Sequence, residues 1–305
     1  MWFRNLTLFR FSEKSARGLK SLESKLDGHR LREVGPQELA SAGFISPYGV
    51  DEEPLVHRVG HYALVTLGRN EKLLPGAVVN QELSARLQKI ETKSGKRPGS
   101  KERKRLKDEI MTELLPRAFS RRSTVHAYFS LENGWLAIDS ASRKIAEETV
   151  TQLRQALGTF PAVPMAAENS PRGLLTDWLI RGKLPAGLAL ADECELRDPV
   201  ESGAVVRCRR QDLETDEVRE HLKSGKQVFQ LGLTFEDRLS FVLGEELTVR
   251  KLRFLDVVQE ELEDNSAESV VAELDARFAL MTLELEKLLE KFENWFGLHR
   301  PTDKS

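Results

Sequence analysis

The stretch STVHAYFSLENGWLAID, from Ser123 to Asp139, decides the fold class of this chain. Apolar and polar residues alternate on either side of Glu132-Asn133-Gly134. Asparagine followed by glycine between two such runs is the strongest short-range signal for a hairpin. The stretch therefore predicts two antiparallel strands joined by a tight turn.

The sequence before this hairpin mixes strand and helix patterns. Trp2–Phe11 and Tyr62–Leu67 alternate as strands do, and a turn is predicted after the second, at Gly68–Asn70. Ser12 is placed to cap a helix that Gly28 is well placed to end. Together the patterns indicate an α+β chain with antiparallel sheets.

Two further helices are predicted around the basic, linker-like loop Ser94–Ser100. Pro116 ends the second helix, because proline disfavours helix in the residue before it. The apolar stripes are Val79, Leu83, Leu87 and Ile90 in the first helix and Leu106, Ile110 and Leu114 in the second. Residues 76–119 are therefore expected to form a basic helical arm.

Beyond the hairpin, helix and strand signals continue to the end of the chain, with a domain boundary expected near the end of the proline-rich Pro161–Pro171. The expected elements are a helix with Ile145, Leu153 and Leu157 that closes at Gly158, a helix around Leu174–Ile180, a strand at Ala204–Arg209, a helix beginning at Thr215, and two or three antiparallel strands within Gln227–Phe254.

The last predicted element is a long helix with heptad spacing. Its apolar residues lie alternately four and three apart, which suits contact with another helix. They are Leu274, Phe278, Met281, Leu285, Leu288, Phe292 and Trp295. Such a stripe either packs on the helix's own domain or mediates dimerisation, and both readings stay open.

Composition describes a folded, soluble protein of the cytoplasm. The 305 residues are 40% hydrophobic and 31% charged, and no apolar run approaches the roughly 18–20 residues that span a bilayer. The N-terminus lacks the apolar block of a signal peptide. Cys194 and Cys208 have no metal-ligand spacing, and two buried thiols in a reducing compartment are expected.

Charge is distributed unevenly along the chain. Arg86–Arg122 contains thirteen Lys or Arg and five Asp or Glu, whereas Asp256–Glu293 contains twelve acids and three bases. The net charge of -2 therefore hides one surface suited to a polyanion and another that repels it or pairs with a basic partner.

No catalytic or cofactor motif emerges from the sequence. A Walker loop, a dinucleotide fingerprint, a zincin motif and a nucleophile elbow are all missing from it. The acids of Asp212–Glu217 are interpreted as the start of a helix capped by Thr215. Glu102-Arg103-Lys104 has the E-x-K order of some nucleases without an evident partner Asp, so a metal-dependent nuclease remains an alternative.

Two basic strips point to nucleic acid. In the first, Lys101, Lys104 and Arg105 point away from the apolar stripe of their helix, at about 100° per residue. In the second, VVRCRRQDL, alternation puts Arg207 and Arg209 on one face of a strand and Arg210 on the other. Few aromatic residues interleave with either strip, which favours duplex backbone binding over single-strand stacking. A solvated surface, or a scaffold that contacts no DNA, is the competing interpretation.

Several segments together resemble the recombination-associated protein RdgC family of proteobacteria, nearly from end to end. The segments that carry the resemblance are WFRNLTLFRF at the start, GFISPYG at Gly43–Gly49, NEKLLP at Asn70–Pro75, LLPRAFSR at Leu114–Arg121, LLTDWL at Leu174–Leu179, VVRCRRQDL at Val205–Leu213, KLRFLD at Lys251–Asp256 and ALMTLEL at Ala279–Leu285.

The resemblance implies a non-catalytic, nucleoid-associated protein without cofactor or metal. It implies a horseshoe-like protomer that forms a ring-shaped homodimer around nonspecific double-stranded DNA and restrains RecA-dependent recombination and replication fork repair. Phe119 would support the dimer gate, and Arg210 and Gln211 would belong to a finger-like element. Arg210 replaces a family lysine, which keeps the charge and changes the donor geometry.

The predicted division of the chain is 1–75 and 120–170 for a central domain, 76–119 for the arm, 171–225 for the finger-like part, and 226–305 for antiparallel strands and the long helix. The residues expected to contact DNA are Lys72, Lys93, Lys96, Arg97, Lys101, Lys104, Arg105, Arg117, Arg121, Arg209, Arg210 and Gln211.

Overall fold

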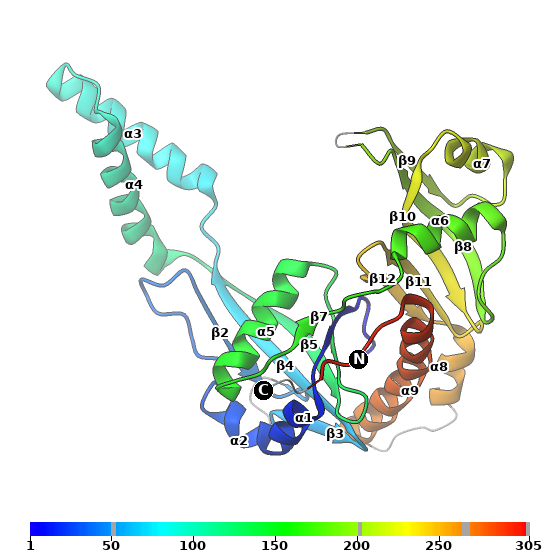
Figure 1. Cartoon of the computed structure of the whole chain (residues 1–305). Helices are drawn as coiled ribbons and strands as arrows, with labels where there is room; N and C mark the ends of the chain where they lie inside the picture. Colours follow the sequence, from blue (N-terminus) through cyan, green and yellow to red (C-terminus); the bar gives the residue numbers. More distant parts are fainter. Residues whose placement is uncertain (50–52, 201–202, 264–268, 303–305) are drawn as a thin grey trace.

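The computed structural model describes residues 1–49, 53–200, 203–263 and 269–302, and it is an α+β fold with two antiparallel sheets (Figure 1). The helices are α1 (Glu13–Gly18), α2 (Leu22–Asp27), α3 (Gly76–Ser94), α4 (Ser100–Leu114), α5 (Arg143–Leu157), α6 (Pro171–Arg181), α7 (Asp216–Lys223), α8 (Asp256–Glu263) and α9 (Val270–Phe296), with 3-10 turns η1 (Leu19–Ser21) and η2 (Leu115–Arg117). The strands are β1 (Thr7–Arg10), β2 (Ala40–Ile45), β3 (Val56–Val59), β4 (Tyr62–Lys72), β5 (Ser120–Ser130), β6 (Trp135–Ile138), β7 (Val163–Pro164), β8 (Leu188–Arg197), β9 (Val205–Arg209), β10 (Gln227–Phe235), β11 (Leu239–Gly244) and β12 (Val249–Phe254).

The first sheet is built around the predicted hairpin. Its order is β2-β4-β5-β6-β1-β7, with β3 also paired to β4. β5 and β6 pair from Ala127↔Ile138 to Ser130↔Trp135, and Gly134 adopts the positive φ that a tight turn requires. The hairpin prediction is confirmed. Tyr128 and Phe129 are both buried, because each face of this sheet is covered.

The second sheet has the order β12-β11-β10-β8-β9. It joins the finger-like residues 171–225 to the strands that follow them, since β8 pairs with both β9 and β10. Three strands form within Gln227–Phe254, as expected.

Helix α9 lies in the seam between the two sheets (Figure 1). Phe278 approaches Tyr128 of the first sheet, with ring centroids 6.1 Å apart, and Phe292 approaches Phe241 of the second, at 6.2 Å. The centre of the heptad stripe, from Phe278 to Phe292, is fully buried within its own chain. Packing on its own domain is therefore the correct reading of the stripe, and the dimerisation reading is wrong because that face is already covered.

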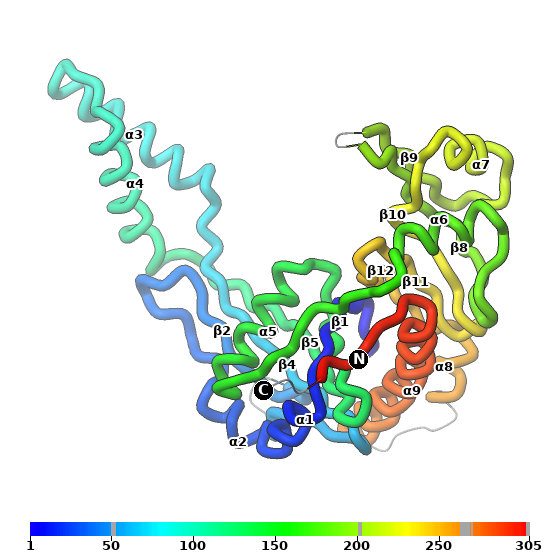
Figure 2. The backbone as a smooth tube through the Cα atoms, in the orientation of Figure 1, coloured from blue at the N-terminus to red at the C-terminus, as the bar shows by residue number. Residues whose placement is uncertain are grey.

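The helices α3 and α4 form an arm that stands apart from both sheets (Figure 2). The arm has its own small core of Val79, Leu83, Leu106 and Ile110. The arm and the second sheet project from the same side of the first sheet, which gives the chain an open, curved outline (Figures 1 and 2).

Two predictions about the strands of the first sheet need correction. Gly68–Asn70 is no turn but the middle of β4, where Gly68 lacks a Cβ that would lie 2.7 Å from Leu31 Cδ2. Only Thr7–Arg10 of the expected strand Trp2–Phe11 forms a strand, because Leu6 pairs instead with Val249 of the second sheet.

The helices at the N-terminus and after the hairpin also differ in detail. The segment that follows the Ser12 cap breaks into α1, η1 and α2 rather than one helix, although Gly28 ends it as predicted. In α5, Ile145 is exposed, and the buried stripe runs through Ala146, Val150 and Leu153 instead.

Candidate nucleic-acid interface

The outer surface of the arm carries the first basic strip. Leu106 and Ile110 of α4 face α3, whereas Lys101, Lys104 and Arg105 are exposed, as the helical period predicts. Lys93, Lys96 and Arg97 are also exposed at the tip, around the Gly95 that ends α3 in a left-handed conformation. Six predicted contact residues are thus brought together on one end of the molecule.

Most of these cations are available to a ligand. Arg105 pairs with Glu109 at 3.4 Å. Across the parts of the chain that the structure describes, no ion pair or side-chain hydrogen bond holds the charged groups of Arg97, Lys101 or Lys104. Long exposed lysines without a protein partner are the groups that exchange counterions for phosphates.

At the base of the arm the predicted cations are partly engaged. Lys72 Nζ donates to the Ala118 carbonyl at 3.4 Å, and Arg121 pairs with Glu71 across the β4–β5 ladder at 3.4 Å. Arg117 is exposed. The exposed Arg121–Glu71 pair is weak and would compete only modestly with a phosphate.

Phe119 is 85% exposed, and it is the one exposed Phe, Tyr or Trp side chain among the described residues. Its backbone is fixed, because its carbonyl accepts a hydrogen bond from the Leu73 amide at 2.7 Å. The structure therefore rules out the reading in which Phe119 anchors the core of its own domain.

The second basic strip lies on β9 and the turn after it. Cys208 is buried while Arg207 and Arg209 are exposed on the other face, as alternation predicts. Arg210 has a positive φ of 53°, which ends the strand and turns the chain. The Gln211 side chain is engaged within the protein, since its Nε2 donates to Glu217 Oε2 at 3.0 Å.

Cys194 and Cys208 are free, buried thiols in directly paired positions on β8 and β9. Burial raises the pKa of Cys194 to about 12, and the nearby Cys208 adds to the shift. The Cys194 thiol is therefore protonated at neutral pH and unreactive as a nucleophile, consistent with the expectation of structural cysteines.

The structure adds basic residues that the sequence reading missed. Arg250 and Lys251 of β12 line a notch of about 450 Å³ together with Arg207 and Arg209 of β9. The run VRKLRF signals basic character. Strict strand alternation, however, puts Arg250 and Lys251 on opposite faces, and only the observed backbone places both at the notch.

The acidic candidates for metal binding do not converge. Among the described residues, no group of three or more His, Cys, Asp or Glu is arranged to hold a metal ion. Asp212 accepts a hydrogen bond from the Glu214 amide at 2.8 Å, and Thr215 begins α7 without a side-chain cap bond. The predicted helix start is confirmed, but the capping role of the Thr215 hydroxyl is not.

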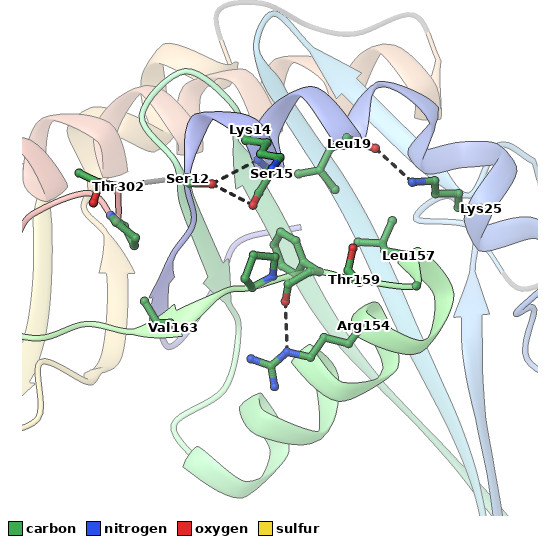
Figure 3. A pocket seen from close by; sticks show the side chains of 15 residues that line it. Ser12, Lys14, Ser15, Leu19, Lys25, Arg154, Leu157, Thr159, Val163 and Thr302 are labelled. Carbon is green, nitrogen blue, oxygen red and sulfur yellow. Dashed lines mark hydrogen bonds between the residues drawn. The ribbon is translucent and has the colours of Figure 1, made fainter. Parts of the chain in front are cut away.

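Elsewhere, a cavity of about 770 Å³ lies beside α1, the end of α5 and the C-terminal segment (Figure 3). Of the cations that line it, Arg154 donates to two backbone carbonyls, those of Phe160 at 3.1 Å and Ala162 at 2.7 Å. Ser12 caps α1 through the Ser15 amide (Figure 3). These polar contacts stabilise the fold and leave no reactive arrangement in this cavity.

No helix in the described ranges is long and apolar enough to cross a membrane.

Comparisons with known proteins agree with the resemblance over the whole chain. A family model described as "Putative exonuclease, RdgC" matches residues 1–299. The chain is 49% identical to the recombination-associated protein RdgC of Xanthomonas axonopodis pv. citri (strain 306) and 48% identical to that of Xanthomonas campestris pv. campestris (strain B100). It is 46% identical to the protein of the same name from Stenotrophomonas maltophilia (strain R551-3).

Each of these alignments spans 301 residues, which is 98% of this chain and 99% of the relative. Identity at this level over nearly the full length of both proteins leaves no part of the fold outside the match. The chain belongs to the RdgC family of recombination-associated proteins.

Proposed function

We propose that this protein binds the backbone of double-stranded DNA without sequence preference and without cleaving it. As a homodimeric ring in the nucleoid, it encircles the duplex and restrains RecA-dependent recombination and replication fork repair. The observation that carries the proposal is the presence of exposed, unpaired cations on both the arm and the second sheet, which project from the same side of the first sheet (Figure 1).

The chemistry of these surfaces favours a duplex backbone over separated bases. Single-strand binders stack bases on exposed aromatic side chains. In the described part of the chain Phe119 is the only exposed Phe, Tyr or Trp, and one such side chain cannot form a platform on which successive bases stack. Clustered Lys and Arg position a phosphate backbone but do not read its sequence.

The ring and its effect on recombination rest on separate support. Phe119 is a large apolar side chain held in solvent on a fixed backbone, as an interface anchor would be. The relatives are named for their association with recombination. Occupation of the duplex by a closed dimer would exclude a recombinase from the same DNA.

A second candidate is a metal-dependent nuclease, which the family description as a putative exonuclease favours. Glu102 and Lys104 lie in the first turns of α4, inside the basic surface of the arm, where an E-x-K arrangement could meet a phosphate.

A binding and cleavage experiment separates the two functions. Gel shifts on covalently closed and linear duplexes of mixed sequence, over a range of salt, should show binding with a log–log slope of about -5 to -7, as expected for about 5–8 phosphates. Incubation of the same DNA with Mg²⁺ should leave it intact. A dimer crosslinked before mixing should bind linear DNA but not closed circles.

Four results would contradict the proposal. Salt-independent binding would remove its electrostatic basis, and a strong preference for one sequence would require base contacts. Magnesium-dependent loss of linear DNA, abolished by Glu102→Gln, would establish the nuclease. If DNA does not bind at any salt while the dimer forms, the scaffold interpretation holds.

A further inference from the structure

The notch between β9 and β12 has an unusual backbone at its centre. β11 and β12 pair as Ser240↔Arg253 and then as Val242↔Arg250, so Phe241 alone faces two residues of β12, Lys251 and Leu252. Lys251 has a positive φ of 51°. This is a β-bulge whose left-handed position is occupied by a lysine, where glycine would be favoured.

The bulge changes which side chains share a face. Val249 and Leu252 are buried, and the two residues between them, Arg250 and Lys251, are both exposed and both line the notch. A regular strand would send one of them to the core side. A left-handed conformation is unfavourable for a side chain such as lysine, and such positions cluster at functional sites.

The opposite wall of the notch contains one buried carboxylate, that of Glu195. Glu195 is buried and accepts hydrogen bonds from Arg197 Nε and Arg207 Nε, each at 2.6 Å. Burial acts to raise the pKa of Glu195, but the hydrogen bonds from Arg207 and Arg197 outweigh it and lower the pKa, so the carboxylate is ionised at neutral pH. Both arginines are thereby oriented before any ligand arrives.

The charge of the notch is strongly positive. Five basic side chains line it, and the two carboxylates Glu193 and Glu195 leave an excess of three positive charges. Glu193 is engaged by Lys251. Within the described ranges, Arg209 and Arg250 have no ion-pair partner, and the terminal Nη groups of Arg207 make no hydrogen bond.

The N-terminal segment that leads into β1 of the first sheet is hydrogen-bonded to β12 of the second sheet beside the notch. Leu6 and Val249 exchange backbone hydrogen bonds at 2.8 and 2.9 Å, and the Leu252 amide donates to the Arg4 carbonyl at 2.8 Å. Asn5, from the same N-terminal segment, also lines the notch.

We propose that this notch is a phosphate-binding site, and that the bulge at Lys251 serves to bring two consecutive cations into it. Guanidinium groups bind phosphate oxygens in bidentate fashion, and no aromatic side chain lines the notch to select a base or a ring. The inference rests on the proposed function, because it takes the bound phosphate to be part of the DNA duplex backbone. A free phosphate compound offers the same chemistry and is the other source to be tested.

The test uses the double variant Arg250→Gln/Lys251→Gly in the full chain. Glycine accepts the left-handed position, so the bulge is retained while the charge is lost. Lys223→Gln is the control, because it removes one exposed positive charge on α7, outside the notch. Thermal melting checks that every variant is folded.

Binding to a covalently closed duplex, which has no terminal phosphate, is measured over a salt series. The double variant should bind about 10- to 100-fold more weakly than the parent, with the log–log slope reduced by about 2, whereas Lys223→Gln should change affinity less than about twofold. Pyrophosphate titrated at constant ionic strength should compete with DNA for the parent protein more effectively than for the double variant.

The outcomes separate the notch from the proposed function. If the parent binds DNA and the folded double variant binds it equally well, the notch proposal is overturned and DNA binding stands. If the parent fails to bind DNA yet binds pyrophosphate, and the double variant does not, the notch is a site for free phosphates and duplex binding is overturned. Binding of neither ligand by the folded parent overturns both.

Discussion

The arm and the second sheet both present positive charge, but they hold it in different ways. The arm has a four-residue core, and its lysines are exposed and have no ion-pair partner among the residues that the structure describes. The second sheet shares the large core of α9, and there Glu195 fixes two arginines while a bulge places two more cations. We infer that the arm attracts and follows a polyanion, whereas the sheet fixes the position of a phosphate. Four experiments can break or sharpen this comparison.

The largest effect is expected from the core of the arm. Ile110 is fully buried in the small cluster between α3 and α4, so Ile110→Ala should cost about 2–5 kcal/mol, enough to open the arm locally. Hydrogen exchange should increase across residues 76–114 and remain unchanged in β8–β12.

Leu231→Ala is the matched change in the second sheet, where Leu231 is equally buried. It should lower the main melting transition, which Ile110→Ala should leave in place. Equal lowering of the main transition by both variants would show that the arm is not an independent unit. Lys107→Ala, on the exposed side of α4, is the neutral control.

The next effect concerns the junction of the arm with the first sheet. Because Phe119 is exposed in the single chain, Phe119→Ala should leave the melting temperature unchanged but weaken one contact of the proposed dimer by about 2–4 kcal/mol. Sedimentation at several concentrations measures the dimer, and thermal melting at low concentration measures the protomer. An intact dimer at matched concentration would remove Phe119 from the interface.

A change in pH should distinguish the first sheet from the arm. Burial lowers the pKa of His126 on β5 to about 4 from its ordinary value of 6.5, with the N-terminal amine adding to the shift, and the imidazole Nδ1 lies 2.9 Å from Thr66 Oγ1. Between these two pH values His126 is protonated in the unfolded chain but not in the folded protein. The free energy of unfolding should therefore fall as pH drops from about 6.5 to about 4, by at most about 3 kcal/mol.

The arm contains no histidine between residues 76 and 117, so its helicity should not change in that pH window. His126→Gln should flatten this part of the pH profile of global stability. A profile that is unaltered in the variant would assign the pH dependence to other groups.

The smallest effects are expected at the finger-like turn. Arg210→Ala should weaken binding to all duplex sequences about equally, with a salt slope lower by about 1. Arg210→Gly tests the charge alone, since the residue has a positive φ. Gln211→Ala should cost about 1 kcal/mol or less, because its amide is already bonded to Glu217. Parental affinity in all three would leave the turn outside the interface.

Local signals in the sequence were sufficient for much of the fold. The Asn133-Gly134 turn, the end of α4 before Pro116 and the exposed cations of α4 all follow from rules that act within a few residues. The turn predicted at Gly68 was wrong. Glycine is common in turns, but here the missing side chain leaves space for Leu31, which is distant along the chain.

What the sequence alone determined is therefore the α+β class, the hairpin, the basic arm and the family. The tertiary structure decided where the heptad face of α9 goes, that Phe119 stays outside the core, and that Arg250 and Lys251 join Arg207 and Arg209. The physical reason is the separation along the chain of the residues that interact. Turns, caps and helical periods depend on neighbours along the chain, whereas a bulge, a buried helix face and a shared notch depend on strands and helices that pack together from distant parts of it.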